Sequence, residues 1–297
     1  MAVLHHMRLA HKFLILGLIA LVMALVPAGL YFGRALDDLG HAKTEIAGTE
    51  PMLAINEVIR YSQIHRGMSA SMLSGNAALE ARRPGVRDKL NAAMSILDAK
   101  LQAAQAPADL QTHWTDIKKT WVELEQAVAS KAIDTPQSTQ RHTALITRQL
   151  QLGEALLDAY RLSQDSGDDT FALVRATLVD MPWLAENMGI MRAMGSSFLT
   201  KADAPPAGRA TLAALHKRAR ELQASMFRNI DRALAFNPDL KPVLAQGAAD
   251  SRAAVDKTLT LAEREVILPA TLSFAAVAYF DDFTRTSMVC LNSTTWP

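Results

Sequence analysis

Two short segments of the chain each combine one arginine with several small residues. Residues 65–75 and 191–201 align so that Arg66 stands opposite Arg192, with methionine, serine and leucine matched nearby. A guanidinium group presents a planar fork of donors that fits carboxylates and oxyanions. Two such groups side by side repel each other unless an anion lies between them. The pair therefore predicts an anion site, if the fold brings the two segments together.

Serines in the same segments complete the candidate ligand-binding set. Ser69 and Ser196 each lie within four residues of an arginine, and small side chains of this kind also let helices approach closely. The alternative is purely structural, with each arginine capping carbonyls at a helix end or pairing with a carboxylate such as Glu57 or Glu186. Both interpretations stay open from the sequence alone.

The remaining reactive residue types do not form a catalytic or metal-binding pattern. The serines lie in no nucleophile-elbow pattern, the single cysteine, Cys290, has no partner thiol, and Asp168 and Asp169 fit a helix cap. The histidines of the body lack ligand-spaced partners and are expected to be solvated on helix surfaces; they are His65, His113, His142 and His216. We expect no enzyme, no metal site and no cofactor.

Composition indicates a helical protein that does not bind nucleic acid. The 297 residues carry a formal net charge of only +1, which provides no global field to attract a polyanion. Hydrophobic residues make up 49% of the chain, enough for a sizeable core. Ala, Leu and Met dominate over β-branched runs, and no segment alternates with a period of two.

Apolar stripes and helix breakers divide the chain into helices. One stripe, from Leu110 to Val128, follows a heptad spacing that packs helices at shallow angles. Boundaries are expected at Gly75, Pro84, Pro107, Asp134, Asp168, Pro205, Asn237 and Pro242, with kinks at Pro182 and Pro269. The predicted fold class is all-α: a transmembrane helix that continues into an elongated antiparallel bundle of stacked four-helix layers.

Residues 13–33 are uncharged and long enough to span a membrane. Basic residues precede this segment and Asp37 and Asp38 follow it, so the N-terminus is expected inside and the body outside the cytoplasm. A cleaved signal peptide is the alternative. The expected organisation is a cytoplasmic N-terminus at 1–12, the membrane helix at 13–33, a periplasmic sensory domain at 34–286 and an irregular tail at 287–297. Met7 is a second candidate start.

Four segments together resemble bacterial methyl-accepting chemotaxis proteins: residues 7–32, 63–75, 176–182 and 215–220. The arginine-containing segment is also similar to the nitrate- and nitrite-sensing type of helical sensor domain. This resemblance implies a homodimeric inner-membrane receptor whose periplasmic bundle binds a small-molecule ligand such as an anion. The family continues into a second membrane span, a HAMP linker and a cytoplasmic signalling coiled coil. Residues 287–297 do not follow that plan, so the chain is expected to be truncated before these parts.

Two functions follow from the resemblance and the residues. The first is the ligand-binding sensory portion of a chemotaxis receptor, with Arg66, Arg192, Ser69 and Ser196 at the ligand. The alternative is a protein that senses nothing, either a decayed receptor fragment or a membrane-tethered helical dimerisation protein. A ligand that binds only the folded state must raise its stability, so thermal shift distinguishes the two.

Overall fold

The computed structural model describes residues 8–75, 77–162 and 167–292, and within these residues it contains helices and no strand. The chain divides into two compact units, residues 1–47 and 48–297. This architecture confirms the predicted all-α class with a long N-terminal helix and a helical bundle.

The long helix α2 (Leu9–Leu73) contains the apolar N-terminal segment. A window of this helix has a mean hydropathy of 2.7 and is not buried by any other part of the described chain. It is therefore a candidate membrane span, as the sequence predicted. The helix ends before Gly75, which has a φ of +92°. Glycine adopts this left-handed conformation without steric cost, which explains the end of α2 at this point.

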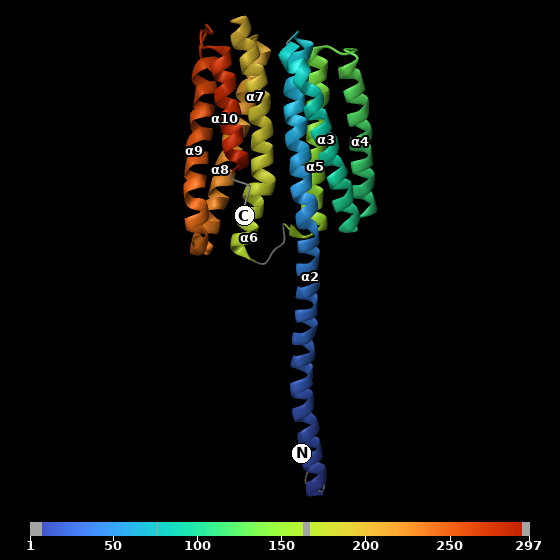
Figure 1. Ribbon diagram of the computed structural model, residues 1–297. Helices are drawn as coiled ribbons and strands as arrows, with labels where there is room; N and C mark the ends of the chain where they lie inside the picture. Colours follow the sequence, from blue (N-terminus) through green and yellow to red (C-terminus); the bar gives the residue numbers. More distant parts are fainter. Residues whose placement is uncertain (1–7, 76, 163–166, 293–297) are drawn as a thin grey trace. The chain divides into compact units, whose positions relative to one another are not determined.

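The C-terminal half of α2 packs with three helices in a first bundle (Figure 1). These are α3 (Ala77–Ala103), α4 (Ala108–Ala129) and α5 (Thr135–Ala159). The heptad stripe of α4 is buried as predicted, including Trp114 and Trp121. Their indole N–H groups donate to Asp98 and Asn91 of α3, at 2.6 and 2.8 Å, so each large apolar ring keeps its one polar atom satisfied.

The second bundle comprises the described residues from 167 onward (Figure 1). Its helices are α6 (Asp168–Val174), α7 (Met181–Lys201), α8 (Pro206–Phe236), α9 (Lys241–Ala262) and α10 (Ala276–Asn292), with a short 3-10 turn η3 (Pro238–Leu240) before α9. One apolar core joins them, and the fully buried rings of Tyr279 and Phe283 on α10 lie within it. Tyr279 also touches the backbone of α7 at Gly195.

Several predicted helix boundaries are confirmed, and the predicted effects of two prolines are wrong. Asp134 caps α5 through a reciprocal capping box with Gln137. Pro84 does not open a helix, because α3 begins at Ala77 and includes it. Pro269 ends a helix rather than bending it: α9 passes into a π-helical turn, η4 (Glu263–Ile267), and α10 begins only at Ala276.

A second π-helical turn, η2 (Arg175–Asp180), joins α6 to α7 just before Pro182. A π turn widens the helix by one residue and is frequent at functional sites.

At the C-terminus of the chain, the prediction of an irregular tail at 287–297 is wrong in part. Helix α10 continues to Asn292, and residues 293–297 lie outside the described part of the chain.

Candidate functional site

The two sequence-matched segments occupy matching places in the two bundles. Arg66 lies on α2, the first helix of the first bundle, and donates from Nη1 to Thr143 Oγ1 on the fourth helix, α5, at 3.0 Å. Arg192 lies on α7 and donates from Nη1 to Thr284 Oγ1 on α10, also at 3.0 Å. The sequence similarity therefore corresponds to a structural repeat, in which each arginine joins the first and last long helices of its bundle.

Arg66 also reaches from the first bundle to the second. Its guanidinium forms an ion pair with Glu186 on α7, and the two side chains are only 5% and 3% exposed. Gln63 of α2 donates to the same carboxylate at 3.0 Å. Glu186 was one of the two carboxylates that the sequence left open as a structural partner, whereas Glu57 pairs with Arg60 instead. The pairing with Glu186 supports the structural alternative for Arg66.

Arg192 lacks such a carboxylate. Among the described residues it forms no ion pair; its guanidinium lies over the ring of Phe280, 4.8 Å from the ring centre. Burial and the positive charge of Arg66 lower the pKa of Arg192 to about 10, against the opposing effect of Glu186. The two arginines therefore lie within electrostatic reach of each other, with one carboxylate to balance two positive charges.

Gly189 makes the close approach of Arg66 to α7 possible. A Cβ atom at this position would lie 3.0 Å from Nη2 of Arg66. Glu186, Gly189 and Arg192 follow at spacings of three along α7, so they share one side of the helix. The guanidinium of Arg66 therefore packs against the bare backbone at Gly189, which lies between Glu186 and Arg192 along α7.

The two candidate serines have different surroundings. Ser69 is fully buried within the first bundle and accepts a hydrogen bond from Arg83 Nε at 3.1 Å, so its hydroxyl belongs to a different polar cluster from Arg66. Ser196, one turn after Arg192, has a buried hydroxyl with no hydrogen-bond partner among the described residues. A buried polar group without a partner is costly unless a ligand or water satisfies it.

A small cavity of about 50 Å³ lies beside the ion pair. The volume exceeds the roughly 30 Å³ that one water occupies in the liquid. Gln63, which contacts Glu186, forms part of its wall. The other residues of the wall come from α2, η2 and the start of α7; they are Asn56, Ile59, Arg60, Thr177, Met181, Pro182 and Ala185.

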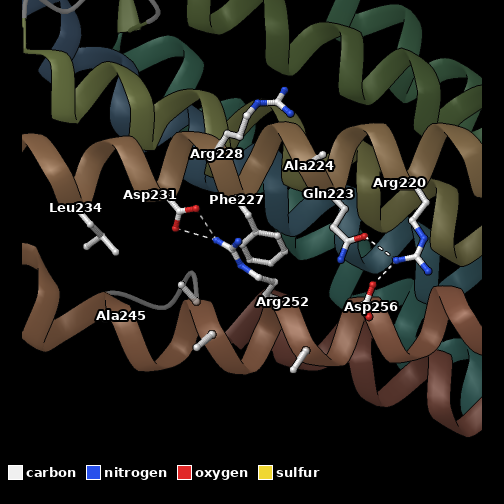
Figure 2. Close-up of a pocket in the computed structure, with 13 residues that line it drawn as sticks. Arg220, Gln223, Ala224, Phe227, Arg228, Asp231, Leu234, Ala245, Arg252 and Asp256 are labelled. Carbon is white, nitrogen blue, oxygen red and sulfur yellow. Dashed lines mark hydrogen bonds and ion pairs between the residues drawn. The ribbon is translucent and has the colours of Figure 1, made fainter.

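A larger groove lies elsewhere, between α8 and α9, with a volume of about 980 Å³ (Figure 2). Its charged side chains are largely paired with each other across the groove. Arg252 binds Asp231 at 2.8 Å and lies over Phe227, while Arg220 pairs with Asp256. Two of its three arginines, Arg220 and Arg252, are already paired with carboxylates, so the groove is a weaker anion site than the arginine pair.

The prediction of solvated histidines is wrong for two of the four. His65 and His142 are fully buried and lie 2.9 Å apart, from Nδ1 to Nε2. Their contact joins residues that are 77 apart in the chain, so no local pattern predicts it. Helical periodicity could have predicted that both are buried, because each falls on the buried stripe of its helix. No group of three or more potential metal ligands occurs in the described residues.

Taken together, the fold and the site define a helical domain with two arginines and one carboxylate at its centre. The model of the family described as nitrate and nitrite sensing matches residues 57–286. The match covers well over half of the chain, which therefore belongs to the nitrate and nitrite sensing family, a family of sensory domains. Comparison with curated proteins and with solved structures gives no match.

Proposed function

We propose that the chain is the membrane-tethered, exported sensory part of a receptor, and that it binds nitrate, nitrite or a similar small oxyanion between Arg66 and Arg192. The observation that carries this proposal is the charge balance of the site. Two arginines from two different bundles approach one carboxylate, Glu186, and leave one positive charge uncompensated. A monovalent oxyanion supplies the missing charge and accepts hydrogen bonds from planar forks.

Ser196 is a further residue whose side chain fits as a hydrogen-bond donor to the anion. Its buried hydroxyl lacks a partner and follows Arg192 by one helical turn. Ser69 instead hydrogen-bonds Arg83, so its role is to hold the first bundle beside Arg66. The small cavity next to Glu186 offers space for an anion or for the displaced carboxylate.

Signalling follows from the position of the site between the bundles. An anion that competes with Glu186 for Arg66 changes the contact between α2 and α7, and α2 is continuous with the candidate membrane span. A shift of one helix along another is a known means of transmission. The resemblance to chemotaxis receptors supports a homodimeric inner-membrane receptor of that class as the protein to which this sensory part belongs.

Thermal unfolding of the full chain in lipid nanodiscs tests the proposal. Nitrate or nitrite at one hundred times its Kd should add about 2.7 kcal/mol of stability, and chloride at equal ionic strength should not. Arg192→Gln should remove the shift, whereas Arg252→Gln, in the α8/α9 groove, should keep it. No shift with any small oxyanion would favour the alternative of a tethered helical protein that senses nothing.

A further inference from the structure

A line of polar contacts crosses the interior of the first bundle from α5 to α3. His142 Nδ1 lies 2.7 Å from the carbonyl oxygen of Ser138, and His142 Nε2 lies 2.9 Å from His65 Nδ1. His65 Nε2 lies 3.2 Å from Glu125 Oε2, which also accepts a hydrogen bond from Arg83. Both histidines are fully buried, and the Glu125 side chain is 15% exposed.

The positions of these atoms fix the number of protons in the line. A carbonyl only accepts, so His142 Nδ1 carries a hydrogen, and a neutral His142 then accepts at Nε2. His65 Nδ1 must donate to it, which leaves Nε2 of a neutral His65 as a bare lone pair facing the Glu125 carboxylate. That contact is attractive only if Nε2 or the carboxyl group is protonated. If His142 rather than His65 or Glu125 carries the charge-changing proton, the line still contains one additional proton.

The unsatisfied atoms of this cluster lie where that proton would bind. Among the described residues, His65 Nε2 and Glu125 Oε1 are buried and have no hydrogen-bond partner. Ser69 does not supply one, because its hydroxyl lies on the opposite nitrogen of His65, 3.3 Å from Nδ1. A proton on either of the two facing groups turns an unfavourable contact into a charge-assisted hydrogen bond.

Charged groups on α3 and α4 act on His65. Burial lowers its pKa, as do Arg83 and Arg87 on α3, whereas Glu125 on α4 raises it. On α5, His142 stays neutral because burial and the neighbouring His65 bring its pKa to about 3. Both imidazoles are therefore neutral at neutral pH, and a nearby negative charge would favour a proton on His65.

Such a negative charge would arrive next door, because the proton site and the candidate anion site use consecutive residues on the same two helices. His65 and Arg66 are neighbours on α2, and their partners His142 and Thr143 are neighbours on α5. The charge of Arg66 is already among the causes that lower the pKa of His142. An anion bound at Arg66 adds negative charge next to the line and therefore relieves repulsion against a proton in it.

We propose that His142, His65 and Glu125 form a proton-binding site coupled to the anion site at Arg66, so that the anion binds together with a proton. This inference rests on the proposed function. By linkage, acidification and anion binding must favour each other equally. The affinity for nitrate should rise about 5- to 150-fold as the proton site fills, the range typical of coupled sites.

Calorimetry of nitrate binding to the full chain in nanodiscs measures this coupling. Titrations at pH 5 to 7, in buffers of different ionisation enthalpy, give the number of protons taken up per nitrate. We expect a net uptake that reaches between one half and one proton, with a lower Kd at pH 5 than at pH 7. His65→Gln and Glu125→Gln should each abolish the uptake, and His216→Gln, on α8, should retain it.

The outcomes separate the two proposals. Nitrate binding without proton uptake, or with equal uptake in His65→Gln, overturns the coupling alone. Absence of binding at every pH for nitrate, nitrite and other small oxyanions overturns the proposed function. Nitrogen NMR of the labelled histidines without nitrate tests the proton site itself. His142 should keep its hydrogen on Nδ1 while His65 gains a second one on acidification. Two histidines that both stay neutral to pH 5, with a Glu125 carboxyl group that carbon NMR shows to stay ionised, would overturn the proton site.

Discussion

At the scale of single residues, Glu186 has two opposed effects. It neutralises Arg66 inside the protein, and under the proposed function it competes with the incoming anion for that arginine. Removing one partner of a buried ion pair leaves the other charge unbalanced, which is more costly than never burying the pair. The same carboxylate should therefore stabilise the empty domain and weaken its affinity for an anion.

Glu186→Gln separates these two effects. The variant keeps the shape of the side chain but loses its charge, so the free energy of unfolding without ligand should fall by about 3 kcal/mol. Anion affinity should rise about tenfold. Unit charges about 4 Å apart interact by roughly 4 kcal/mol near a protein surface, and removing about one third of that repulsion between Glu186 and the anion lowers the Kd by a factor of ten. Denaturant unfolding and nitrate titration measure the two changes. A fall in both stability and affinity would contradict this account of Glu186.

Also at the residue scale, the buried neutral His142 predicts a loss of stability in acid. Its pKa is about 3 in the folded chain, below the ordinary 6.5, so the folded state binds fewer protons between these values. Stability is complete above pH 6.5 and falls as the pH decreases, by about 1.4 kcal/mol per pH unit for this one group.

Unfolding of His142→Gln between pH 6.5 and 5 checks that slope. The variant should be less pH-dependent than the natural chain by about one proton. His113→Gln, at a half-exposed position on α4, should leave the slope unchanged. Equal slopes in all three proteins would show that His142 is not buried in its neutral form.

At the scale of helices, small residues act by position rather than by type. Gly67, next to Arg66, has no neighbour within 4 Å of an added Cβ, whereas Gly195 in the matching segment would place a Cβ 2.5 Å from the Tyr279 ring. The sequence predicted close helix packing in both segments. Only the segment on α7 uses its glycine in this way, because the large ring of α10 lies across it.

Gly195→Ala should destabilise the second bundle by about 1 to 3 kcal/mol, since the backbone or the Tyr279 ring must move. The matched control is Gly247→Ala on α9, where an added Cβ meets nothing within 4 Å. Alanine there should gain about 0.5 to 1 kcal/mol from helix propensity. Denaturant midpoints of the two variants should shift in opposite directions, and a shift in the same direction would contradict the close approach of α7 and α10.

Most of the helices could be predicted from the sequence, and the reasons are local. The capping box at Asp134 and the left-handed Gly75 depend on neighbours within a few residues. Pro84 misled because a helix that had already begun at Ala77 tolerates it. The π turn η2 had no such signal, since it packs against α8, which lies further along the chain.

The candidate site was only partly predictable for the same reason. The repeated arginines were visible in the sequence, but their threonine partners lie 77 and 92 residues away. The pairing of His65 with His142 likewise depends on the packing of α2 against α5. Contacts between distant helices follow from the tertiary fold, and no spacing along one helix encodes them.

At the scale of the whole molecule, the proposals require α2 to cross the inner membrane with the bundles outside the cytoplasm. The apolar segment is preceded by Arg8 and Lys12 and followed by two aspartates, which favours this orientation. A reporter enzyme that is active only in the periplasm, fused after residue 292, should be active in a bacterial host. The fusion should remain in the membrane fraction after alkaline extraction.

The control for this last prediction replaces Leu21 and Leu25 with arginine. Each charge near the centre of a span opposes insertion by roughly 3 kcal/mol, so the double variant should leave the reporter inactive and the chain out of the membrane. A shortened, soluble fusion with an active reporter would show a cleaved signal peptide in place of an anchor. In that case α2 could still help to form an anion site, but it could not carry the shift between α2 and α7 into a membrane.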